Sequence, residues 1–175
     1  MSNWSAIVGA RGDDKTKALD QVLSQLQQQG VRLAGFYQER VVDAADEVLG
    51  WDIVRLGGPG RRSLARRSPN PDLCEYAFEA PGFAVAAEWA RASDVDLLVV
   101  GGLGKLEAAE TGHWPLVQTL IEDASAPHAL LCIRDTSLSS LAFRLPDPQA
   151  HLHLPCESAE LTTFCTELAR LVRRA

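Results

Sequence analysis

Apolar runs alternate with amphipathic stretches along most of this chain. The clearest run is residues 95–100, where five of the six positions are apolar and polar positions do not alternate with them. That pattern is typical of a central parallel strand covered on both faces. Shorter apolar runs predict strands at residues 4–8, 31–38 and 129–133, and helical spacing predicts helices at 14–29, 81–92, 115–123 and 158–173.

This alternation of strands and helices predicts a single α/β domain over residues 1–175, built as a three-layer sandwich around a mostly parallel sheet. Residues 39–68 differ, because short strand-like pieces there are separated by a Gly-rich turn at 57–60. We therefore expect a small antiparallel, β-rich insertion in that segment. Residues 135–150, which contain Pro146 and Pro148, read as a connector, and residues 149–175 predict a C-terminal strand/helix extension.

Composition narrows the class of protein. The net charge of −6 and the pI of about 5.2 give no electrostatic case for binding nucleic acid or an anionic membrane. No apolar run reaches the roughly 18 residues of a membrane helix, and the N-terminus does not resemble a signal peptide. The four cysteines form no CxxC pair, so we expect them to be reduced. These features predict a soluble cytoplasmic domain.

The segment between the first strand and the first helix resembles a phosphate-binding loop. Residues 9–16, GARGDDKT, approach the pattern GxxxxGK(S/T), in which backbone N–H groups surround phosphates at a helix N-terminus. The second glycine of the pattern is replaced by Asp14. Two interpretations stay open: Asp13 or Asp14 caps the helix where a phosphate would lie, or the loop binds a nucleotide weakly, with or without Mg²⁺. The candidate phosphate-binding residues are Gly9, Gly12, Lys15 and Thr16.

Three further segments resemble one known family. They are residues 35–39 (GFYQE), the pieces GWDIVRL at 50–56 and LARR at 64–67, and GGLGKLE at 101–107. Over roughly residues 4–134 the chain resembles the thermophile-type, or cancer-related, P-loop nucleoside-triphosphatases. It resembles most their uncharacterised bacterial relatives, which are often encoded beside molybdate-transport genes. The resemblance implies a P-loop-NTPase-like fold.

The chain departs from the family pattern at the positions where the resemblance implies metal-binding and catalytic side chains. Gly101 stands where the resemblance implies an aspartate that holds Mg²⁺, and Gly102 where it implies a glutamate that polarises water. Gly104, Lys105 and Glu107 retain the rest of the motif, so we expect this second-motif pocket to serve structure or a different ligand. The resemblance therefore implies the fold and argues against efficient hydrolysis.

Three other groups of residues are candidate sites. An arginine cluster either binds an oxyanion such as molybdate or pairs with Asp and Glu side chains. His151, His153 and Cys156 either hold Zn²⁺ or Cu⁺ with one further ligand or belong to an ordinary strand with polar residues facing outward. His113 either lines a pocket or lies in a loop. The arginine cluster comprises Arg55, Arg61, Arg62, Arg66 and Arg67.

The sequence favours a non-hydrolysing binding or regulatory protein, with a small anionic ligand or a protein partner over the carboxyl ends of the strands. One alternative is a weak nucleoside-triphosphate phosphohydrolase that uses Lys15, Thr16 and Glu107. Another is an accessory protein that handles molybdenum, another oxyanion or a metal. The closing helix could pack on the core or on a second subunit, which leaves a homodimer open.

Overall fold

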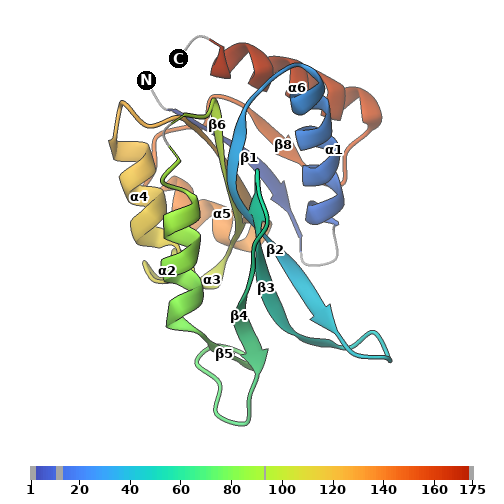
Figure 1. Ribbon diagram of the computed structural model, residues 1–175, viewed down its shortest axis with the longest axis vertical. Coiled ribbons are helices and arrows are strands. Elements are labelled where there is room, and N and C mark those ends of the chain that lie inside the picture. The colour runs from blue at the N-terminus through green and yellow to red at the C-terminus, as the bar shows by residue number, and fades with distance from the viewer. Residues whose placement is uncertain (1–2, 11–13, 93, 174–175) are drawn as a thin grey trace.

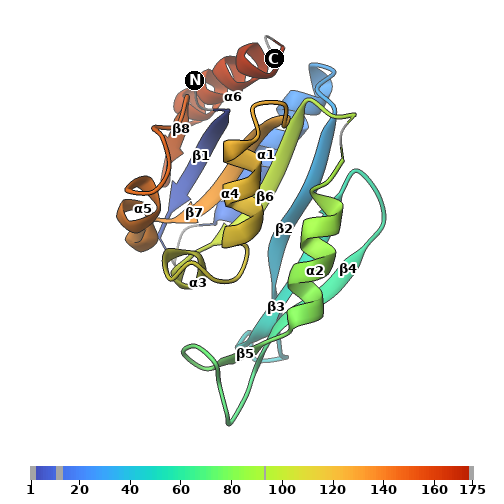
Figure 2. The ribbon, with the colours of Figure 1, turned by 90° about the vertical axis from the view of Figure 1, so that its left-hand side faces the viewer.

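In the part of the chain that the structure describes, an eight-stranded sheet forms the centre, with helices on both faces (Figures 1 and 2). The computed structural model describes residues 3–10, 14–92 and 94–173. The strand order is β5-β4-β3-β2-β6-β7-β1-β8. This arrangement confirms the predicted α/β fold with a mostly parallel central sheet and an antiparallel portion.

Five neighbouring strands make the parallel portion of the sheet. Their order places β7 between β1 and β6. The motif-like segments 9–16 and 101–107 therefore leave the same edge of the sheet, one strand apart. In order across the sheet, the strands are β2 (Leu33–Val42), β6 (Leu97–Leu103), β7 (His128–Arg134), β1 (Trp4–Gly9) and β8 (His151–His153).

The antiparallel portion begins on β2, which pairs in parallel with β6 and in the antiparallel sense with β3 (Val48–Leu56). Strands β4 (Arg61–Arg67) and β5 (Tyr76–Phe78) extend it outward. Figure 1 shows the β2–β3 hairpin projecting from the body of the molecule.

Two hydrophobic cores lie on opposite faces of the sheet. Helices α1 (Lys15–Gln28) and α6 (Ser158–Val172) cover one face, and α2 (Ala80–Trp89), α4 (Trp114–Glu122) and α5 (Asp135–Ala142) cover the other. Strand β7 contributes side chains to both cores because alternate side chains of a strand point to opposite faces. Leu130 and Cys132 pack under α1 and α6, whereas Leu131 and Ile133 face α4 and α5. The short helix α3 (Lys105–Ala108) follows β6.

Two expectations about local structure are wrong. Residues 135–142 form helix α5 rather than a connector, because Leu141 is fully buried and Leu138 packs against the same core. Strand β6 does not break after Val100; it continues to Leu103, with a shift in its register against β7. Within the described residues, none of the helices has the length and apolar character needed to cross a bilayer.

Candidate functional site at the carboxyl edge of the sheet

Helix α1 begins at an aspartate cap. The Oδ1 atom of Asp14 accepts a hydrogen bond from the backbone N–H of Lys17 at 2.8 Å, so a carboxylate satisfies one of the free amides of the first turn. Asp14 is therefore the N-cap of α1, and of the two aspartates predicted for that role it is the one that lies within the described residues. Gly12, and with it Arg11 and Asp13, lies outside the described residues.

Lys15 places a cation at the carboxyl end of β1. Its Nζ atom donates to the carbonyl oxygens of Gly9 at 3.0 Å and Ala10 at 2.7 Å, so the side chain folds back over the end of the strand. A Cβ atom added at Gly9 would come within 3.0 Å of the Lys15 Cγ, which shows how closely the lysine stem follows the backbone there. Thr16 follows on the exposed side of the first turn.

The two glycines near the end of β6 are packed against β2. A Cβ added at Gly101 would lie 2.6 Å from the Cα of Tyr37, and one added at Gly102 would overlap the side-chain amide of Gln38. Gly102 also has a φ of +85°, a conformation that side chains with a Cβ rarely adopt. The space beside this segment is therefore occupied by β2.

Glu107 is a buried carboxylate held by backbone amides. Only 2% of the residue is exposed, and its two carboxylate oxygens accept hydrogen bonds from the N–H groups of Gly104 and His113, each at 2.8 Å. Burial raises the pKa of Glu107, and these amides oppose that shift. The side chain thus links the start of α3 to the start of α4. Lys105 instead lies at the surface, with its Nζ 3.5 Å from the Cys74 Sγ.

His113 is buried rather than displayed in an open loop. Its ring lies between those of Phe36 and Phe83, with centroids 4.8 Å away on each side. Its Nε2 atom is 3.5 Å from the Nε2 of Gln38. Burial lowers the His113 pKa to about 3, so the imidazole is neutral near pH 7. Sequence reasoning could not find this packing because its partners come from β2 and α2.

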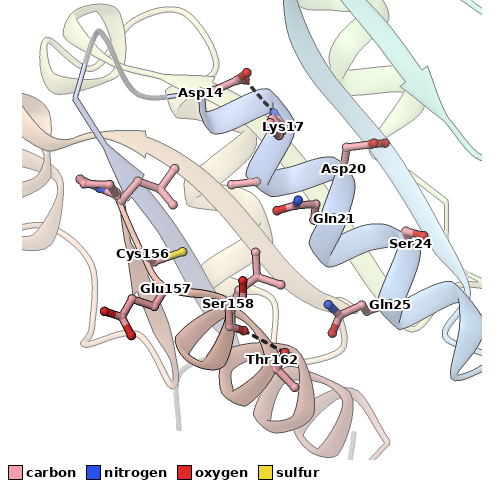
Figure 3. Close-up of a pocket in the computed structure, with 14 residues that line it drawn as sticks. Asp14, Lys17, Asp20, Gln21, Ser24, Gln25, Cys156, Glu157, Ser158 and Thr162 are labelled. Carbon is pink, nitrogen blue, oxygen red and sulfur yellow. Dashed lines mark hydrogen bonds between the residues drawn. The ribbon is translucent and has the colours of Figure 1, made fainter.

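A groove that the sequence analysis missed runs between α1 and the segment joining β8 to α6 (Figure 3). Its volume is about 650 Å³, and it starts at Asp14 and Lys17 beside the first turn of α1. Polar side chains line both walls, and Figure 3 shows α1 along one side and the start of α6 along the other. The only feature of the sequence that pointed to this groove was the polar outer face of each helix. The labelled polar residues along the two helices include Gln21, Ser24, Gln25, Ser158 and Thr162.

The arginine cluster lies on the antiparallel strands, and three of its members form ion pairs. Arg61 and Arg66 both contact Asp52, and Arg61 also contacts Glu39. Arg67 lies 3.3 Å from Glu47 and 3.8 Å from Glu75. Asp52 is itself buried, so the two arginines that contact it neutralise a buried carboxylate.

The two C-terminal histidines are exposed on β8 with their rings in edge contact, 5.0 Å between centroids. Cys156 lies in the wall of the groove, and burial raises its pKa. Across the described part of the chain, no three His, Cys, Asp or Glu side chains come together as a set that could hold a metal ion.

The strand–loop–helix of β1 and α1, with β7 between β1 and β6, defines a P-loop-NTPase-like domain. The family model described as NTPase matches residues 5–146, so the chain belongs to this family.

Two solved structures are similar over almost their full length. The solution structure of a human cancer-related nucleoside triphosphatase has a TM-score of 0.70 and 17% identity, with 99% of this chain and 98% of that chain covered. The crystal structure of THEP1 from the hyperthermophile Aquifex aeolicus has a TM-score of 0.69 and 16% identity, with 98% and 99% covered. None of the curated proteins matches the chain.

Proposed function

We propose that this NTPase-family protein binds an anionic ligand at the β1–α1 loop without hydrolysing it efficiently, and acts as a binding or regulatory protein. A nucleoside triphosphate is the first candidate ligand. The observation that carries the proposal is the packing of β2 against Gly101 and Gly102, where the family resemblance implies acidic side chains.

The residues at this edge do not fit the Mg²⁺ ion that the family implies. Mg²⁺ prefers carboxylate oxygens and tight octahedral geometry, and glycines at 101 and 102 supply no such oxygen. Glu107 retains a carboxylate in the same motif, but backbone amides already occupy both of its oxygens. No water-activating acid is left in the motif, which supports ligand binding without turnover.

The β1–α1 loop retains some of the features that bind phosphate. Lys15 brings an ammonium group to the end of β1, and the N-terminus of α1 favours an anion. Asp14 opposes this, because a carboxylate and a phosphate about 4 Å apart repel each other by roughly 4 kcal/mol before compensation, at an effective dielectric of 20. The adjoining groove offers polar contacts for the remainder of a ligand.

Calorimetric titration of ATP and GTP, with and without Mg²⁺, tests the proposal in wild type, Asp14→Gly and Asp14→Asn. Asn keeps a side-chain acceptor for the Lys17 amide but removes the charge, so it separates repulsion from loss of the cap. We expect weak binding by wild type, tighter binding by Asp14→Asn, and no phosphate release by any variant. Mg²⁺-dependent phosphate release that Lys15→Ala abolishes would overturn the proposal.

That overturning result would instead support a weak nucleoside-triphosphate phosphohydrolase, which is favoured by the presence of Lys15 and Thr16 at their motif positions. An oxyanion- or molybdenum-handling role is the other alternative, and it rests on the resemblance to relatives encoded near molybdate transporters and on Arg55, Arg66 and Arg67. Arg66 and Arg67 already pair with carboxylates. Molybdate titration into wild type and Arg55→Gln tests that role.

A further inference from the structure

Arg134 lies directly beside the phosphate-loop end of β1. It is the last residue of β7, and its partner in the parallel register is Gly9, the last residue of β1. Neighbouring strands are about 4.8 Å apart, so the two backbones are adjacent. The Gly9 carbonyl is one of the two oxygens that accept a hydrogen bond from the Lys15 ammonium group. The register therefore brings an arginine and a lysine to the same end of the sheet.

The alternation of side chains along β7 places Arg134 on the α1 face. Leu130 and Cys132 pack in the core beneath α1 and α6, and Arg134 follows them with the same period of two. Lys15 approaches this row of residues as well: its charge partly offsets the burial that raises the Cys132 pKa to about 12. Arg134 and Lys15 thus share one face as well as one edge of the sheet.

Arg134 is a half-buried residue, and its side chain has no hydrogen-bond or ion-pair partner within the described residues. Arg144, at the other end of the α5 region, is different: its Nε lies 2.7 Å from Glu110, and it also donates to the carbonyl of Ser140. Of these two arginines, only Arg134 keeps its donors available at the carboxyl edge. A guanidinium presents a rigid fork of donors that matches phosphate oxygens.

We propose that Arg134 and Lys15 together hold the phosphate chain of the ligand without a metal ion. The inference rests on the proposed function and identifies the bound group as an oligophosphate. Mg²⁺ in an NTPase site neutralises phosphate charge and bridges phosphate oxygens. Here the motif does not supply the acids for that ion, and Arg134 on the strand between β1 and β6 supplies positive charge instead.

Calorimetry with ATP and with inorganic triphosphate, each in EDTA and in Mg²⁺, tests this assignment. The proteins are wild type, Arg134→Gln, Arg134→Lys and the matched control Arg144→Gln. Wild type and the control should bind both probes in EDTA at least as tightly as in Mg²⁺. Arg134→Gln should weaken binding by about tenfold or more, as expected for a lost hydrogen bond to a charged group. Arg134→Lys should fall between them, because it keeps the charge but loses the fork.

The outcomes separate this inference from the proposed function. Binding by wild type that Arg134→Gln leaves unchanged, or binding that disappears in EDTA, would overturn the inference and leave an anion-binding loop. Failure of wild type to bind either probe would overturn both. Thermal unfolding of each variant checks that it is folded, so a loss of binding by Arg134→Gln with an unchanged midpoint reports on the site.

Discussion

The side chain of Gln38 occupies the volume that a Cβ on Gly102 would need. Gln38 comes from β2, and its amide also lies 3.5 Å from the ring nitrogen of His113, so it bridges the end of β6 to the start of α4. The space beside residue 102 is therefore filled by a side chain from a neighbouring strand. An acidic side chain at this position would require β2 to change too.

Gly102→Glu should destabilise the fold. A residue with a Cβ at a φ of +85° is strained, and the new side chain would overlap Gln38. We expect a loss of roughly 2–4 kcal/mol in the free energy of unfolding, measured by urea denaturation.

Gly104→Ala is the control for this substitution, because nothing lies within 4 Å of a Cβ added there. It should have a clearly smaller effect. The double variant Gly102→Glu with Gln38→Ala should recover part of the loss, because it removes the overlap but not the backbone strain. Equal stability of Gly102→Glu and wild type would contradict the packing described.

Glu107→Gln should also destabilise the protein, although it changes a single atom. One carboxylate oxygen becomes an NH₂ group that faces a backbone N–H, so either Gly104 or His113 loses its acceptor. An unsatisfied buried donor costs about 1–3 kcal/mol. Chemical denaturation of Glu107→Gln and of the exposed control Glu88→Gln would measure this difference. A variant as stable as the control would exclude a structural role for the carboxylate.

The free energy of unfolding should fall as the pH drops below the ordinary histidine value of 6.5. The folded-state pKa of His113 is lowered to about 3, so between these values the unfolded chain takes up a proton that the folded protein does not. This one group contributes a slope of up to about 1.4 kcal/mol per pH unit, which ends near pH 3. The buried His128, whose pKa is about 4, adds to the slope in the same direction.

His113→Phe isolates the first of these contributions, because it keeps an aromatic ring between Phe36 and Phe83 but removes the titrating nitrogen. The measurement is urea unfolding from pH 7 to pH 5. The variant should show a shallower pH dependence than wild type. Equal slopes for His113→Phe and wild type would show that His113 is accessible to protons in the folded state.

The four cysteines should react with a thiol reagent at different rates. Cys74 is exposed, whereas Cys132 and Cys165 are buried, with pKa values raised to about 12 and about 11. Cys156 is half-buried, and its pKa is raised. We expect one fast thiol that Cys74→Ser removes, a slower one, and two that react only on unfolding, followed by the absorbance of released nitrothiobenzoate. A fast phase that persists in Cys74→Ser would contradict this order.

The sequence predicted the elements whose pattern is local. Helix α1 has a continuous apolar stripe, and the apolar run of β6 matches a strand buried on both faces. Helix α5 was missed because only Leu138 and Leu141 mark its inward face, amid small polar residues, and two prolines follow closely. The extension of β6 to Leu103 depends on the left-handed turn at Gly102, which no apolar pattern reveals.

The sequence predicted only those features of the candidate site that residues close together in the chain form. The cap at Asp14 follows from one residue and the helix after it. The occupation of the space beside Gly102, the aromatic contacts of His113 and the pairing of Arg134 with Gly9 all join segments far apart in sequence. In the sequence nothing distinguishes Arg134 from the other arginines. Its position beside Gly9 becomes clear only from the strand order, which places β7 beside β1.

The position of β1 between β7 and β8 has a consequence for how the chain is made. Among the strands of this sheet β1 is translated before the others, but both of its neighbours are translated only from His128 onward. The β2–β3–β4 hairpins pair locally and can form as they emerge, whereas β1 must wait with both edges open. Open strand edges are sites of association with other chains, so β1 is the strand of this sheet most in need of protection until β7 and β8 have been translated.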